Sequence, residues 1–166
     1  MKYFCFLFAF LLTLSACSSK QQNENEHTKY SIWNENVITA NKYLVKEDSE
    51  RISNYIKRRS WHCLDGQGGI KYMIFSSSSA DSLNFNPEFS MVYRVELLDG
   101  TVCYTDEKQL VYPSSEMDSG LNHTFKKFCH GDSLVLILPP HYSKGLIGDL
   151  DKIPPHSVVV YYIKIK

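Results

Sequence analysis

Apolar residues recur with the period of a β-strand along most of the second half of the chain. Five segments fit strands, either by this alternation or as a short continuous apolar run: residues 70–75, 90–98, 101–105, 133–138 and 157–165. Asp99 and Gly100, between the second and third of these segments, form a strong hairpin-turn signal. The pattern therefore predicts a sheet in which at least these two strands run antiparallel.

Two other segments follow the helical period. In residues 34–62 the apolar positions recur at helical spacing, and the basic residues close to the end favour a helix through its dipole. Residues 119–128 predict one short amphipathic helix, because their apolar side chains fall at positions i, i+4 and i+7: Leu121, Phe125 and Phe128. We therefore expect an α+β fold, an antiparallel sheet wrapped on one short helix, with a helical N-terminal segment before it.

The N-terminus has the pattern of a bacterial lipoprotein signal. Residues 3–14 are apolar, follow one lysine, and are fewer than the ~20 residues that a membrane-spanning helix needs. The next residues, Leu-Ser-Ala-Cys, resemble a lipobox, which predicts a signal peptide at 1–16 and acylation of Cys17. The alternative is a plain cleavage site followed by an incidental cysteine. Residues 17–33 would be a lipidated tether, flexible because residues 18–28 have few apolar side chains.

A lipid anchor would place the protein in the cell envelope, since each buried methylene of an acyl chain contributes roughly 0.8 kcal/mol to membrane binding. Ser18 and Ser19 lack the charge that would favour retention at the inner membrane. We therefore expect the outer membrane, with the protein facing the periplasm.

Composition narrows the function further. With 166 residues, 43% of them hydrophobic, the chain can bury one core, and its formal net charge of zero disfavours nucleic acid as a partner. We find no nucleophile motif of a hydrolase, no nucleotide-binding glycine motif and no zinc-ligand spacing, so we expect no cofactor and no metal. Three cysteines remain in the predicted folded part: Cys63, Cys103 and Cys129. They allow at most one disulfide, and the sequence does not indicate which pair would form it.

Residues 120–165 carry a specific series of motifs. Gly-Leu opens the short helix, a glycine turn and a strand follow, and then come Pro-x-x-Tyr ending at Tyr142, two glycines, and an Ile-Pro-Pro that begins at Ile153. This series resembles the C-terminal half of FKBP-type peptidyl-prolyl cis-trans isomerases. The hairpin from Tyr93 also resembles that family, so the likeness covers about residues 70–166. Together with the lipoprotein signal and the helical segment, it resembles the gliding-motility-associated branch of the family.

The resemblance implies a proline-binding pocket beneath the segment between the two Pro-Pro pairs, which we call the flap (residues 139–155). By carry-over, Tyr93 is a wall and Leu121 the floor, where many members have Trp. The other implied catalytic positions are Cys103, Tyr104, Tyr142, Ile153 and Tyr161, and the implied substrate-binding positions are Met117, Asp118 and Lys144. The alternative for Tyr93, Leu121 and Tyr161 is that they are only core residues.

Three departures from the family pattern bear on activity. Cys103 and Tyr104 stand where the family usually has Phe-Asp, Lys144 replaces a flap tyrosine, and Leu121 makes a shallower floor than Trp. The first hypothesis is therefore a membrane-anchored prolyl isomerase, with reduced activity, that acts on proline-containing exported polypeptides. The second is a non-catalytic FKBP-like chaperone or binding lipoprotein, and the third is a structural lipoprotein of an envelope complex. In each case the N-terminal helix would be the interaction element, for example in a homodimer.

Overall fold

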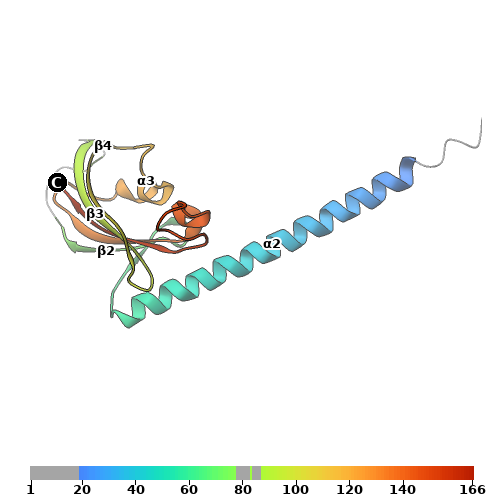
Figure 1. Ribbon diagram of the computed structural model, residues 1–166, viewed down its shortest axis with the longest axis horizontal. Coiled ribbons are helices and arrows are strands. Elements are labelled where there is room, and N and C mark those ends of the chain that lie inside the picture. The colour runs from blue at the N-terminus through green and yellow to red at the C-terminus, as the bar shows by residue number, and fades with distance from the viewer. Residues whose placement is uncertain (1–18, 78–82, 84–86) are drawn as a thin grey trace, which may run out of the picture. The chain divides into compact units, whose positions relative to one another are not determined.

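The computed structural model describes residues 19–77, 83 and 87–166, and within its first helix the side chains from residue 32 onward (Figure 1). The chain divides after Leu44 into two compact units. The predicted signal peptide and Cys17 lie outside the described residues. Among the residues described, no helix combines the length and the apolar character needed to cross a membrane.

The first element is a helix of 40 residues, α2 (Ser19–Arg58). It begins inside residues 17–33, which we expected to be a flexible tether, and this expectation is corrected for the backbone from Ser19 onward. The physical reason is that this stretch contains neither glycine nor proline, so a polar composition does not stop a helix there. The helix ends at Arg58, four residues before the predicted end, and Lys57 and Arg58 occupy its last turn.

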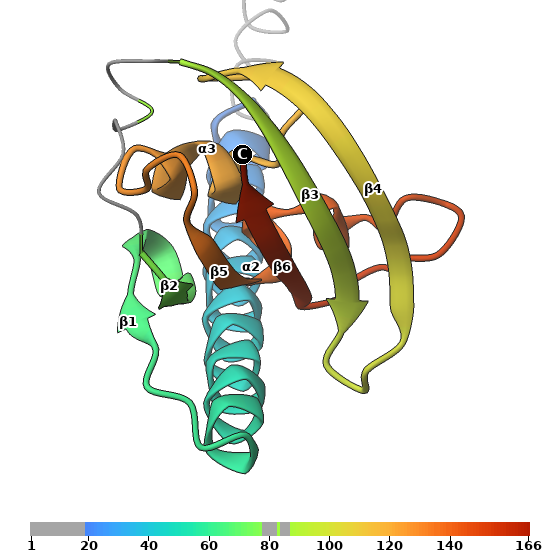
Figure 2. The ribbon, with the colours of Figure 1, turned by 90° about the vertical axis from the view of Figure 1, so that its left-hand side faces the viewer.

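Six strands form one sheet in which every neighbouring pair is antiparallel, in the order β1-β2-β5-β6-β3-β4 (Figure 2). The strands are β1 (Leu64–Asp65), β2 (Lys71–Ser76), β3 (Glu88–Leu97), β4 (Val102–Val111), β5 (Ser133–Leu138) and β6 (Val159–Ile165). One short helix, α3 (Ser119–Phe125), and three 3₁₀ turns complete the described elements: η1 (Gln67–Gly69), η2 (Pro140–Tyr142) and η3 (Lys144–Leu146). The expected α+β architecture is confirmed.

The hairpin of β3 and β4 is longer than the sequence pattern suggested. We expected the second strand to end at residue 105, but β4 continues to Val111, because residues 106–109 have polar side chains on both faces and so hide the alternation. The register shifts between Val95 and Glu96, which pair with Tyr104 and Val102 respectively. Cys103 is therefore the extra residue of a β-bulge.

Alternation along the central strands divides the core into two clusters. On β6, Val159, Tyr161, Ile163 and Ile165 belong to the cluster that contains the α3 side chains, as the period of two predicts. On the opposite face, β5 and β6 pack against the last turns of α2 through Ile52 and Tyr55. Because the central strands are covered on both faces, β5 is a continuous apolar run in the sequence.

A buried carboxylate joins the end of α2 to the end of the flap. Asp48 is 3% exposed, and its Oδ1 lies 3.3 Å from Nη1 of Arg51 and 3.7 Å from Nε2 of His156. His156 follows Pro155 and has a φ of 58°, so the chain turns sharply there. This contact lies wholly within the second unit, residues 45–166, next to the residue that follows the flap.

Candidate functional site

The hairpin of β3 and β4 forms one wall of a cavity. Three cross-strand pairs present their side chains to it: Met91 with Lys108, Tyr93 with Asp106, and Val95 with Tyr104. Since side chains two residues apart share a face of a strand, β3 supplies an apolar and aromatic row and β4 a polar row. Burial raises the pKa of Tyr93, and among the nearby charges Lys108 opposes this shift and the Asp106 carboxylate adds to it.

The floor of the cavity contains a polar pair among apolar side chains. Leu121, on the first turn of α3, is buried, and the ring of Tyr161 from β6 lies with its centroid 6.2 Å from that of Tyr93. The Tyr161 hydroxyl donates a hydrogen bond of 2.8 Å to Oδ2 of Asp118. Burial raises the pKa of Asp118, although the hydrogen bonds from Tyr161 and from the backbone N–H of Lys144 oppose the shift. Burial and the neighbouring carboxylate raise the pKa of Tyr161 well above its usual value.

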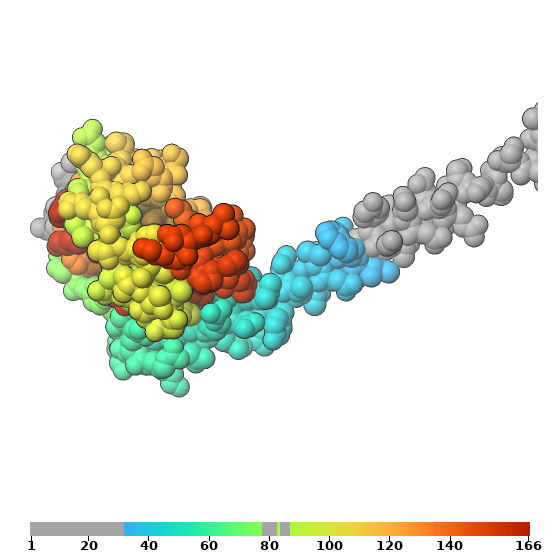
Figure 3. Space-filling view, viewed as in Figure 1, coloured from blue at the N-terminus to red at the C-terminus, as the bar shows by residue number. Residues whose placement is uncertain are grey.

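The flap is fastened to the hairpin by Tyr104. The Tyr104 hydroxyl donates a hydrogen bond to Asp149 and lies 3.3 Å from Oδ2 of Asp151. The Lys152 ammonium makes a cation–π contact with the Tyr104 ring, with its Nζ 5.0 Å from the ring centroid. Asp149 Oδ1 also accepts the backbone N–H groups of Asp151, Lys152 and Ile153, at 3.0, 2.9 and 2.8 Å. Desolvation opposes ionisation of Asp149, but these hydrogen bonds outweigh it and lower its pKa to about 2. The flap and the hairpin lie side by side on the surface (Figure 3).

Between the hairpin, α3 and the flap lies a cavity of about 440 Å³. This is within the usual size range of small-ligand sites. Apolar and aromatic side chains from β3, α3 and β6 line it together with the Asp118 carboxylate, and charged side chains from β4 and the flap lie at its rim. The residues that line it are Met91, Tyr93, Val95, Tyr104, Asp106, Lys108, Glu116, Met117, Asp118, Leu121, Lys144, Asp149, Asp151, Ile153 and Tyr161.

The structure brings together eight of the ten pocket residues that the sequence suggested. These are Tyr93, Tyr104, Met117, Asp118, Leu121, Lys144, Ile153 and Tyr161. Tyr161 is only 7% exposed and still reaches the cavity, so it serves both the core and the site. Their roles in catalysis and binding remain predictions.

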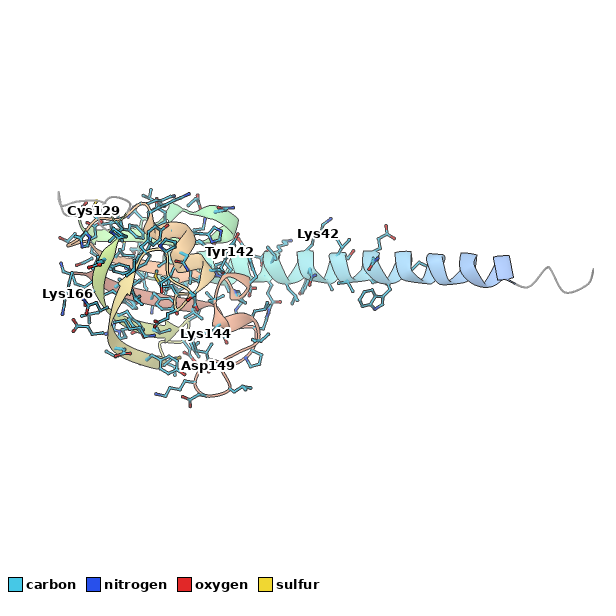
Figure 4. The ribbon with its side chains drawn as sticks, turned by 90° about the horizontal axis from the view of Figure 1, so that it is seen from above. Lys42, Cys129, Tyr142, Lys144, Asp149 and Lys166 are labelled. Atoms are coloured by element: carbon cyan, nitrogen blue, oxygen red, sulfur yellow. The ribbon has the colours of Figure 1, made fainter. Side chains whose placement is uncertain are left out.

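The other two residues lie elsewhere. Cys103 is 3% exposed and packs in the core, with its Sγ 3.6 Å from the carbonyl oxygen of Lys152, because the β-bulge turns it beneath the cavity wall. Tyr142 packs against the rings of His123 and His141 and lies close to Gly68 (Figure 4). It lies at the start of the flap and is absent from the cavity lining. Neither residue lines the cavity, so the structure separates these two predicted positions from the other eight.

Sequence reasoning missed the charged residues of the rim. Asp106 and Lys108 follow Tyr104 at intervals of two, so they share its face of β4. This would have been predictable from the sequence if the strand had been extended beyond residue 105. Glu116 precedes the floor, and Asp149 and Asp151 lie in the flap, where Figure 4 labels Lys144 and Asp149. Only the fold shows that these three carboxylates face the same space.

No group of three His, Cys, Asp or Glu side chains in the described ranges is arranged to hold a metal ion. Cys63, Cys103 and Cys129 are free thiols, and burial raises the pKa of Cys63 and of Cys103. A raised pKa disfavours the thiolate, so these two groups are poor nucleophiles. The aromatic side chains that line the cavity are Tyr93, Tyr104 and Tyr161.

No protein-family profile matches the chain, and no curated protein is significantly similar to it in sequence. Solved structures, in contrast, are similar to it in fold. A peptidyl-prolyl cis-trans isomerase from Pseudomonas syringae pv. tomato has a TM-score of 0.62 and 17% identity, over 75% of this chain and 92% of that one. FkpA from Escherichia coli has a TM-score of 0.57 and 16% identity, over 99% of this chain and 79% of that one.

The crystal structure of the three FKBP domains of wheat FKBP73 is also similar, with a TM-score of 0.52 and 17% identity. The match covers 62% of this chain and 47% of the wheat chain. At these identities the likeness establishes the fold. The chain has an FKBP-like α+β fold, and its structural neighbours are FKBP-type isomerases.

Proposed function

We propose that the protein is an FKBP-type peptidyl-prolyl cis-trans isomerase that assists the folding of exported proteins. The observation that carries the proposal is the cavity itself, in which Tyr93, Leu121 and Ile153 surround a hollow beneath the flap. The likeness of the fold to that of known isomerases supports the same function.

This chemistry requires no catalytic triad. An X-Pro bond isomerises over a barrier of ~18–20 kcal/mol without breaking a covalent bond, so a catalyst has to bind the twisted amide better than either planar form. The twisted amide has lost resonance and is less polar at its carbonyl, which favours a cavity with an apolar wall. A hollow of about 440 Å³ has room for a proline ring and part of its neighbours.

A protease-coupled assay with the peptide Ala-Leu-Pro-Phe-anilide tests this function. Tyr93→Ala removes one aromatic wall and is expected to lower kcat/KM by at least about tenfold, from the apolar surface that the substrate no longer buries. Tyr162→Ala is the matched control, because Tyr162 is also half-buried but lies on the opposite face of the sheet. Equal activity of the two variants would reject this site, and a wild-type chain without activity would reject the enzyme.

A second candidate is a binding module without catalysis, and the flap favours it. Leu146, Ile147 and Leu150 are exposed, and a groove of about 570 Å³ beside the first two shares Asp118, Lys144 and Asp149 with the cavity. An exposed apolar rim of this kind could hold an unfolded segment. This function predicts suppression of aggregation with no acceleration of isomerisation.

We also propose attachment to the envelope through lipid on Cys17, at the outer membrane facing the periplasm. The support is the sequence pattern of residues 1–17. Metabolic labelling with a fatty acid tests it: the wild-type chain should take up label and Cys17→Ser should not. Labelled Cys17→Ser would contradict the proposal.

A homodimer through α2 is proposed on the spacing of its exposed side chains. Trp33, Val37, Ala40 and Leu44 are exposed and follow one another at intervals of four, three and four, as in the a and d positions of a coiled coil. Light scattering on the full chain should give twice the mass of one chain. Trp33→Glu should return it to one, and a monomeric wild-type chain would contradict the dimer.

A further inference from the structure

Negatively charged side chains outnumber positively charged ones around the cavity, and this excess indicates which substrates the cavity binds. Five carboxylates and two lysines line the cavity, which gives a net charge of −3 when all are ionised. The selectivity that we infer from this excess rests on the proposed function. It concerns the residue beside the proline, and the acceptance of proline itself is unaffected by it.

Both lysines are already engaged by neighbouring carboxylates. Lys108 Nζ lies 3.5 Å from Oε2 of Glu116, and the charge of Lys144 acts on Asp118, which also accepts its backbone N–H. The three remaining carboxylates are Asp106, Asp149 and Asp151. None of them forms an ion pair with a basic side chain of the described residues. Their hydrogen-bond donors are hydroxyl and backbone N–H groups, which carry no formal charge. The Lys152 ammonium lies over the Tyr104 ring, 5.0 Å from its centroid, and forms no ion pair with any of the three.

These three carboxylates are held in place around the mouth of the cavity. Asp149 is fixed by three backbone N–H groups and by Tyr104, which also contacts Asp151. Asp106 accepts the backbone N–H of Glu107 at 2.8 Å and pairs with Tyr93 across the hairpin. Tyr93 and Tyr104 are themselves walls of the cavity. Asp149 and Asp151 are therefore one hydrogen bond away from the surface that would contact the proline, and Asp106 is a cross-strand neighbour of that surface. Preorganised charges of this kind attract a cation without the cost of ordering flexible side chains.

We propose that the site selects prolyl segments that carry lysine or arginine beside the proline. Consecutive Cα atoms are about 3.8 Å apart, so a residue adjacent to a proline bound in the cavity reaches its rim. A lysine or arginine side chain there would lie between β4 and the flap, facing Asp106, Asp149 and Asp151. A glutamate in the same place would be repelled by all three.

Because the carboxylates are partly exposed, the expected selectivity is moderate and sensitive to salt. Solvent-accessible ion pairs are weak individually, and two or three acting together correspond to a preference on the order of tenfold at low ionic strength. The preference should fall severalfold near 0.5 M salt, where the screening length is only about 4 Å. A preference from packing alone would keep its size.

The test measures kcat/KM of the full chain for Ala-Lys-Pro-Phe-, Ala-Leu-Pro-Phe- and Ala-Glu-Pro-Phe-anilide at low and high salt. The expected order is Lys, Leu, Glu, with about tenfold between the first and last. Asp106→Asn and Asp151→Asn should each lower the Lys-to-Glu ratio, and the double variant should bring it near one. Glu47→Gln, an exposed carboxylate on α2, is the matched control and should leave the ratio unchanged.

Fluorescence anisotropy with labelled forms of the same peptides separates this inference from the proposed function. If isomerisation is catalysed and the Lys-to-Glu ratio is one in both assays, the selectivity is overturned and the isomerase stands. If no peptide is isomerised but the Lys peptide binds best and loses its advantage in Asp106→Asn, the selectivity stands and catalysis is overturned. If neither catalysis nor binding is detected, both are overturned.

Discussion

At the scale of single residues, the floor of the cavity is the least expected feature of the site. The sequence suggested Asp118 as a substrate-binding position and Tyr161 as a catalytic position, without relating the two, whereas in the structure they form a hydrogen-bonded pair. A buried acceptor that loses its donor costs more than the hydrogen bond contributed. The pair therefore fixes the position of the aromatic ring against which a proline would pack.

Tyr161→Phe is expected to destabilise the fold by about 1–3 kcal/mol, because it leaves the Asp118 carboxylate short of a donor. Unfolding in urea measures the difference. Tyr142→Phe is the matched control, since the Tyr142 hydroxyl makes no hydrogen bond within the described residues, and it should change the stability by less than about 0.5 kcal/mol. Equal effects of the two substitutions would show that the pair contributes nothing.

Asp149 gives a prediction about pH. Its pKa in the fold is about 2, below the ordinary 3.8, so its ionised form stabilises the fold. This contribution is complete above about pH 4 and is lost as the pH falls toward 2. The free energy of unfolding of the wild-type chain should thus exceed that of Asp149→Asn near neutral pH, and the gap should close between pH 4 and 2. A gap that does not change with pH would contradict the role of the carboxylate.

At the scale of elements, the flap and the hairpin have to stay together for the cavity to exist. Tyr104 is the link between them, through Asp149 and Asp151. Two glycines in the flap permit its compact path. A methyl group at Gly145 would come 1.9 Å from the carbonyl oxygen of Ser157, and Gly148 has a φ of 76°.

Tyr104→Phe is expected to loosen the flap without unfolding the sheet. Amide hydrogen exchange should accelerate in residues 144–153 and remain unchanged in β5 and β6, and kcat/KM should fall severalfold. Tyr43→Phe, at an exposed position of α2, serves as the control. Unchanged exchange in the flap of Tyr104→Phe would show that other contacts hold it.

Gly145→Ala is expected to destabilise the fold by about 2 kcal/mol or more, because the added methyl group meets the backbone, which cannot move aside as a side chain can. Gly100→Ala is the comparison. Gly100 has a φ of 93° but open space around it, so its substitution should cost only the backbone strain, about 1 kcal/mol. Thermal unfolding of both variants measures the difference, and a smaller effect at Gly145 would contradict the close approach.

The elements were predictable to different degrees, for physical reasons. The run at 133–138 was predicted with the observed bounds, because a strand covered on both faces is apolar throughout. The end of β4 was missed because residues 106–109, which precede the buried Leu110, are polar on both faces. The start of α2 was missed because residues 19–29 are polar all round. The aromatic residues of the cavity were found through family motifs, whereas its carboxylates were missed, since their convergence depends on the path of the flap.

At the scale of the whole molecule, the second unit contains more than the strands and α3. Its boundary at Val45 includes the last turns of α2, and Ile52 and Tyr55 are completely buried against β5 and β6. The end of the helix is thus part of the core of the second unit, although the resemblance to the isomerase family covered only residues 70–166.

Two fragments test this division. Residues 45–166 should fold with a stability close to that of the full chain. Residues 60–166 should lose about 4 kcal/mol or more, because the sheet face that Ile52 and Tyr55 cover becomes exposed. Urea unfolding of both fragments decides the matter. Equal stability would mean that the helix end is not part of the core.

The proposed function requires a proline to enter the cavity beneath the flap, and one NMR titration tests this most directly. The full chain, labelled with ¹⁵N, is titrated with Ala-Leu-Pro-Phe, and both the protein shifts and the cis/trans exchange of the peptide are followed. The account predicts faster exchange and shift changes centred on Tyr93, Leu121, Ile153 and Tyr161. Exchange at the uncatalysed rate, or shift changes confined to other surfaces, would contradict it.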